Sequence, residues 1–152
     1  DEQILEALQA VRLARKDSGV DFLEGVVEEG GQNYSVGERQ LLCLARVLLA
    51  KPKVLVMDEA TASVDGETDA FIQGMLRTRF VGTTLLTVAH RLNTIMDYDS
   101  ILVMDKGRAA EFGTPKELLE KAGLFADLVA STGEESARAL RDMAFSNSFI
   151  EN

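Results

Sequence analysis

Short apolar runs that alternate with helical stretches constrain the fold of this chain more than any other feature. The runs are KVLVM (53–57), TTLLTVAH (83–90) and SILVMD (100–105). The first is too short for a buried helix and suits a buried strand. After the third, Asp105-Lys106-Gly107 predicts a hairpin turn into RAAEF (108–112). Strands that alternate with helices favour an α/β fold with a mainly parallel sheet flanked by helices.

Capping residues mark the expected helix starts. Ser35 and Glu38 have capping-box spacing ahead of an apolar stripe. Thr114-Pro115-Lys116-Glu117 combines a second capping box with proline at the first helical position. Asp1 and Asp65 are candidate caps of two further helices.

Composition limits the class of protein. The chain has 152 residues, 46% of them hydrophobic and 27% charged, as in a single globular domain. A net charge of −9 argues against nucleic-acid binding through a basic face. No apolar run approaches the roughly 20 residues of a membrane span. The single Cys43 favours a reducing compartment, and its apolar surroundings predict that it is buried.

Titratable side chains follow the first two expected strands. Asp58 and Glu59 end the first strand, and His90, the only histidine, ends the second. Ligands of parallel α/β sheets bind beyond the carboxyl ends of the strands. Asp58 can hold Mg²⁺, and Glu59 can accept a proton from an attacking water. Alternatively, the two acids only open a solvated turn and His90 is structural.

A second candidate site lies in NYSVGERQLLCLAR (33–46). Ser35 and Gly37 lie at a helix start, where free N–H groups and the helix dipole attract phosphate. Gly37 has no side chain, so an anion can approach its backbone closely. By itself, the stretch is equally compatible with Ser35 capping its own helix.

Motifs in a fixed order resemble the nucleotide-binding domain of ABC transporters. The similar segments are YSVGE (34–38, signature motif), VLVMDE (54–59, Walker B), ASVD (62–65, D-loop), TVAHRLNTI (87–95, switch histidine) and DKGRAAEFGTPKELL (105–119, hairpin and helix). Their order and spacing agree across residues 1–131. Val36 in the signature and the sequence around it are most similar to the second nucleotide-binding domain of the multidrug-resistance-associated (C) subfamily, in its C-terminal half.

The resemblance implies a partial P-loop NTPase-like domain. Residues 1–50 would be part of a helical subdomain ending in the signature motif and its helix, and residues 51–131 would be the core from Walker B onward. Residues 132–152 would form a C-terminal tail, in which SARALRDMAF predicts a marginal helix. The chain contains no G-x-x-x-x-G-K-[ST], so the Walker A loop is expected upstream, and the chain alone is not expected to be active.

The resemblance also implies roles for individual residues. The residues that would contact the γ-phosphate of an ATP held by an opposite domain are Ser35, Val36, Gly37 and Glu38, and Gln40 is also expected to take part in cofactor binding. Asp58 would orient Mg²⁺, Glu59 would polarise the attacking water, Asp65 would link the two ATP sites of a dimer, and His90 would sense the γ-phosphate. Glu38 stands where the family usually has glutamine, and a carboxylate there repels phosphate unless it caps back onto Ser35.

The implied cofactors are ATP and Mg²⁺, and the implied activity is ATP hydrolysis coupled to export across a membrane. The expected partners are a second nucleotide-binding domain, whose ATP site the signature face completes, and the Walker A portion and transmembrane domains of the parent. These would hold the chain at the cytoplasmic face of a membrane. Two alternatives stay open: a non-catalytic, truncated module that docks on another nucleotide-binding domain, and a soluble ABC ATPase.

Overall fold

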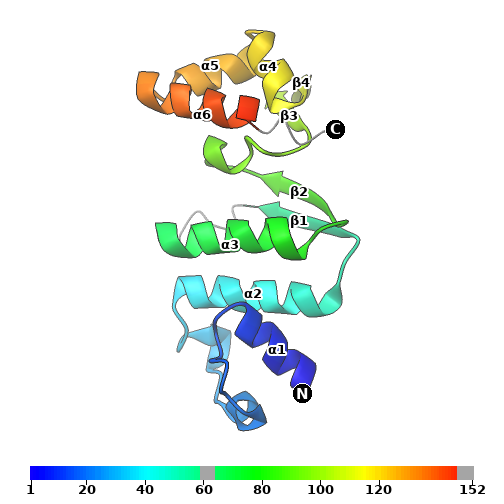
Figure 1. Ribbon diagram of the computed structural model, residues 1–152, viewed down its shortest axis with the longest axis vertical. Coiled ribbons are helices and arrows are strands. Elements are labelled where there is room, and N and C mark those ends of the chain that lie inside the picture. The colour runs from blue at the N-terminus through cyan, green and yellow to red at the C-terminus, as the bar shows by residue number, and fades with distance from the viewer. Residues whose placement is uncertain (59–63, 147–152) are drawn as a thin grey trace. The chain divides into compact units, whose positions relative to one another are not determined.

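The computed structural model describes residues 1–58 and 64–146 (Figure 1). The chain divides into two compact units, Asp1–Val88 and Ala89–Asn152. Each unit has an apolar core of its own.

Unit 1 stacks helices against a small parallel sheet. Its elements are α1 (Glu2–Ala10), the 3₁₀ turns η1 (Val20–Glu24) and η2 (Glu29–Gly31), α2 (Val36–Ala50), β1 (Val54–Asp58), α3 (Gly66–Arg79) and β2 (Thr84–Val88). Helix α2 lies between α1 and α3, and α3 lies between α2 and the sheet (Figure 1). Strands β1 and β2 pair in parallel, with Asp58 opposite Val88. This confirms the predicted strand–helix–strand unit.

The core of unit 1 consists of helical stripes and the inward side of the sheet. Its buried members are Ala7, Val11, Leu44, Ala45, Ile72, Met75, Leu76 and Phe80. Cys43 is exposed, so the prediction of its burial is wrong. Its neighbours Leu44 and Ala45 take the inward positions of α2, and the helical rotation per residue turns Cys43 away from the core.

Strand β1 is buried on one face only, which corrects the expectation of a fully buried strand. Leu55 packs against the core, whereas Val54 and Val56 are 56% and 63% exposed. Leu86 and Val88 of β2 share that outward face and are also exposed. Within the described part of the chain, the core elements of unit 1 pack against the other face, so these apolar side chains remain open to solvent.

The uncovered apolar face predicts that the 152-residue chain associates with itself. Size-exclusion chromatography should show oligomers or aggregates. A Val56→Lys variant should shift the profile toward monomer, because a charge on this face opposes contact between two apolar surfaces. Val81→Lys is the matched control, since Val81 is 83% exposed but lies outside the strands. A sharp monomer peak with a cooperative melt for the unaltered chain would contradict this prediction.

Unit 2 packs helices around a β-hairpin. Its elements are η3 (Leu92–Thr94), β3 (Ile101–Asp105), β4 (Arg108–Gly113), α4 (Pro115–Glu120), α5 (Leu124–Ala130) and α6 (Glu134–Ser146). The predicted hairpin is confirmed: Asp105 pairs with Arg108, and the two turn residues, Lys106 and Gly107, have φ of 48° and 75°. Positive φ at both positions is what a type I′ turn requires.

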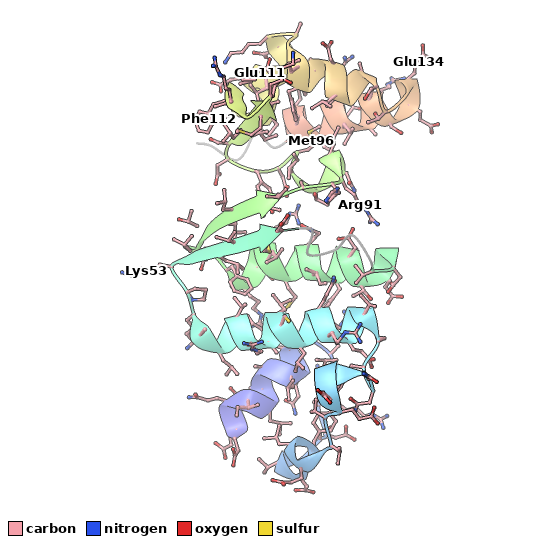
Figure 2. The ribbon with its side chains drawn as sticks, turned by 180° about the vertical axis from the view of Figure 1, so that it is seen from behind. Lys53, Arg91, Met96, Glu111, Phe112 and Glu134 are labelled. Carbon is pink, nitrogen blue, oxygen red and sulfur yellow. The ribbon has the colours of Figure 1, made fainter. Side chains whose placement is uncertain are left out.

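Helix α6 belongs to the core of unit 2 and realises the helix predicted within SARALRDMAF. Its inward residues Ala137, Leu140 and Ala144 pack in the same cluster as Met96 and Phe125, each 1% exposed (Figure 2). The spacing of these three residues places them on one side of the helix. Residues 147–152 of the expected tail lie outside the described part of the chain.

Glu111, in β4, caps α5 (Figure 2). Its Oε1 accepts a hydrogen bond from the Leu124 N–H at 2.8 Å, and its Oε2 accepts one from the Phe125 N–H at 2.9 Å. A Cβ at Gly123 would overlap this carboxylate. Glycine at position 123 therefore makes room for a cap that comes from a distant strand.

Candidate functional site

The start of α2 is a complete capping box, as Ser35 and Glu38 predicted. The Glu38 N–H donates to Ser35 Oγ at 3.2 Å, and the Ser35 N–H donates to Glu38 Oε2 at 2.8 Å. Hydrogen bonds from the Ser35 backbone and then from its side chain hold the pKa of Glu38 below its ordinary value of 4.5. Glu38 is therefore ionised at neutral pH and turned back onto its own helix start.

Asp65 caps α3 through Oδ1 of its carboxylate, which confirms the predicted cap, and its Oδ2 bonds to a side chain of the same helix. Oδ1 accepts hydrogen bonds from the backbone N–H of Glu67 at 3.1 Å and of Thr68 at 3.0 Å, and Oδ2 accepts one from Thr68 Oγ1 at 2.8 Å. The backbone and then the side chain of Thr68 hold the pKa of Asp65 below its ordinary value of 3.8. The carboxylate is thus charged and fixed in direction.

The starts of α2 and α3 lie against each other. A Cβ built on Gly37 would lie 3.7 Å from Thr68 Cγ2 and 3.8 Å from Val64 Cγ1, which is ordinary van der Waals contact. Tertiary packing therefore brings YSVGE and the end of ASVD, which are distant in sequence, to one place in unit 1. An alanine side chain fits at position 37, and a longer one would extend toward α3.

The remaining candidate residues lie elsewhere in the chain. Asp58 is exposed at the carboxyl end of β1, and Glu59 lies outside the described residues. Gln40 has a buried Oε1 with no hydrogen-bond partner in the described part of the chain. His90 is exposed in unit 2, between β2 and η3.

No metal-binding group of three or more His, Cys, Asp or Glu side chains occurs among residues 1–58 and 64–146. Asp58 still offers the hard oxygen donor that Mg²⁺ prefers. Water and phosphate oxygens commonly supply further ligands to this ion at nucleotide sites.

Thr68 is the member of the site that the sequence analysis missed. It follows its cap Asp65 by three residues, which places its N–H and its hydroxyl beside the capping carboxylate. That spacing is a usable signal for the hydrogen bonds. Its closeness to Gly37 depends on packing and has no signal in the local sequence.

Acid should weaken these helix starts. Glu38, Asp65 and Glu117 of the Thr114 capping box all have a lowered pKa in the folded chain. Their stabilising effect is present above the ordinary values of 4.5 and 3.8 and is lost as the pH falls through the lowered values. Thermal melts followed by circular dichroism from above pH 4.5 downward should show a falling melting temperature.

The double variant Glu38→Gln with Glu117→Gln should make the melting temperature less dependent on pH. Glu120→Gln is the matched control, because Glu120 lies on α4 outside both capping boxes. An unchanged slope in the double variant would show that the capping carboxylates do not cause the acid sensitivity.

Comparison with known proteins agrees with the motifs. The ABC transporter family matches residues 1–62. Over 146 residues the chain is 50% identical to ABC transporter C family member 3 of Dictyostelium discoideum, covering 95% of this chain and 10% of that protein. Over 137 residues it is 50% identical to ATP-binding cassette sub-family C member 3 of Rattus norvegicus, covering 88% and 9%. The chain thus spans about a tenth of the length of these curated relatives.

A solved structure shares the fold. The structure of a bacterial Atm1-family ABC exporter with ATP bound superimposes with a TM-score of 0.72 at 34% identity. The match covers 88% of this chain and 23% of that chain.

The chain belongs to the ABC transporter family, and its fold is that of a partial ABC ATPase domain of α/β class. Within the family, its similarity is to the C subfamily, as the sequence around the signature motif predicted. No helix in the described ranges 1–58 and 64–146 is long and apolar enough to cross a membrane.

Proposed function

We propose that this chain is the C-terminal half of the second nucleotide-binding domain of a C-subfamily ABC transporter that couples ATP hydrolysis to export. The observation that carries the proposal is the set of motifs in family order, two of which meet where Gly37 faces Thr68. Similarity to C-family proteins over 95% of the chain supports it.

In this proposal, the start of α2 completes the ATP site of a second nucleotide-binding domain. Its residues Val36 and Gly37 present backbone N–H groups to the γ-phosphate, and Ser35 stands with them at the positive end of the helix dipole. Gln40, one turn further along the helix, would also take part in binding the nucleotide. The absence of a side chain at Gly37 lets the anion approach the backbone.

Glu38 has a structural role in the proposed site. Its carboxylate bonds to the Ser35 N–H, so it orients the helix start on which the phosphate would rest. Its negative charge also reduces the positive potential there. We therefore expect Glu38→Gln to keep the turn and to strengthen ATP-driven closure of the dimer.

The hydrolytic residues follow the strands. Asp58 would hold Mg²⁺, Glu59 would accept the proton of the attacking water, and His90 would hydrogen-bond the γ-phosphate. Mg²⁺, when bound, neutralises charge on the phosphate oxygens. Asp65 would link the two ATP sites across the dimer.

We propose that the chain has three parts. Residues 1–50 belong to the helical subdomain, residues 51–131 to the ATPase core, and residues 132–152 to a C-terminal extension. The proposed partners are a second nucleotide-binding domain and the Walker A portion and transmembrane domains of the parent protein. Membrane association would come through those parts.

Alone, the 152-residue chain should bind MgATP very weakly and hydrolyse none. The reason is that it contains no G-x-x-x-x-G-K-[ST] loop to cradle the phosphates. Calorimetry on the purified chain measures this. Micromolar affinity, about −8 kcal/mol, would show that the remaining residues suffice and would contradict the prediction.

ATP turnover by the full-length protein in inside-out membrane vesicles tests the proposal itself. Turnover that depends on Glu59 and on the signature residues supports it. The alternative, a non-catalytic docking module, predicts binding to another nucleotide-binding domain without any dependence of turnover on Glu59.

A further inference from the structure

We infer that Thr68 is a positioning residue that joins the signature helix start to Asp65, an inference that rests on the function proposed above. Thr68 bonds to Asp65 and lies close to Gly37. Its hydroxyl donates to Asp65 Oδ2 at 2.8 Å and its N–H donates to Oδ1 at 3.0 Å. Its methyl carbon lies 3.7 Å from the Cβ position of Gly37.

The hydrogen bonds of Asp65 restrict the orientation of its carboxylate. A carboxylate offers about four lone-pair directions. Three are taken, by the N–H groups of Glu67 and Thr68 and by the Thr68 hydroxyl. Counting the bonds to residues 1–58 and 64–146, one acceptor direction remains on Oδ2, and the bond from the Thr68 hydroxyl helps to orient this oxygen. If Asp65 links to a second ATP site, the orientation of its carboxylate toward that site depends on Thr68.

The short distance between Thr68 and Gly37 would couple the start of α2 to Asp65. A methyl group at position 37 would lie in van der Waals contact with the β-branched Thr68 and with Val64, so the space between Gly37 and these side chains is that of a single Cβ. Packed interfaces have little free volume, so a small movement of the α2 start toward α3 would close this space. A shift of the α2 start when it meets phosphate would therefore press on Thr68 and change the direction of Asp65.

Substitution of Thr68 in the full-length protein tests the inference. Thr68→Val keeps the shape of the side chain beside Gly37 but removes the hydroxyl. It should lower kcat by about tenfold, the effect of losing one hydrogen bond to a charged group, with KM for ATP changed less than twofold. Thr68→Ser restores the hydroxyl and should return kcat to within about threefold of the unaltered protein.

Thr78→Val is the matched control, because the Thr78 hydroxyl also bonds on α3, to the Gly74 carbonyl at 2.8 Å, away from the two motifs. It should leave kcat unchanged. If Thr68→Val does not fold, the pair Thr68→Ser and Thr68→Ala, which differ by the hydroxyl alone, gives the same comparison.

Two results would overturn the inference while the proposed function stands. One is a normal kcat in Thr68→Val, and the other is an equal loss in the serine variant and the variant without a hydroxyl. By contrast, unaltered turnover in Glu59→Gln and Gly37→Asp would overturn the proposed function, and the role of Thr68 with it.

Discussion

Glu59→Gln in the full-length protein should block ATP hydrolysis and leave ATP binding intact. Glutamine keeps the size of the side chain and part of its hydrogen bonding, but it cannot accept the proton of the attacking water. General-base catalysis contributes about 10²–10⁴-fold, or roughly 3–5 kcal/mol of barrier. Single-turnover hydrolysis and retention of labelled ATP measure the two effects separately. The variant should trap ATP in a closed dimer.

Asp58→Asn is the matched control for Glu59→Gln, because the two residues are adjacent at the end of β1 but have different proposed roles. It should weaken the positioning of Mg²⁺ and should not accumulate trapped ATP to the same extent. Turnover of Glu59→Gln at the unaltered rate would reduce Glu59 to a strand-end carboxylate, and the general-base assignment would have to be withdrawn.

Gly37→Asp should abolish ATP-driven closure of the dimer. The new carboxylate would add bulk and negative charge at a helix start that must accept phosphate. The structure adds a second reason: a side chain at position 37 points toward Thr68 and Val64, beside the ionised Asp65. Nucleotide-dependent dimerisation and steady-state turnover measure the loss.

Gly37→Ala separates the two reasons, because its Cβ fits in ordinary contact with Thr68 and Val64. It should keep most of the turnover if charge is the main cause. Unchanged dimerisation and turnover in Gly37→Asp would mean that YSVGE is not a signature motif.

Features that depend on a few neighbouring residues were predictable from the sequence. The capping boxes at Ser35 and Thr114 and the turn at Lys106-Gly107 are confirmed because each is built from side chains and backbone within four positions. The parallel pairing of β1 and β2 followed from two apolar runs separated by a helix, since that connection favours parallel strands. The family assignment followed from the order of the motifs.

Features that depend on which elements pack together were decided only by the tertiary structure. Cys43 lies in an apolar stretch, yet it is exposed because the rotation of α2 turns its neighbours inward. Val56 lies in an apolar run that predicts a buried strand, yet its side chain is on the face of the sheet opposite the core. The closeness of Gly37 to Thr68 brings together two helix starts that no local pattern connects. Local rules describe a residue's preferences, whereas burial and contact depend on distant segments that fill, or leave open, the space around it.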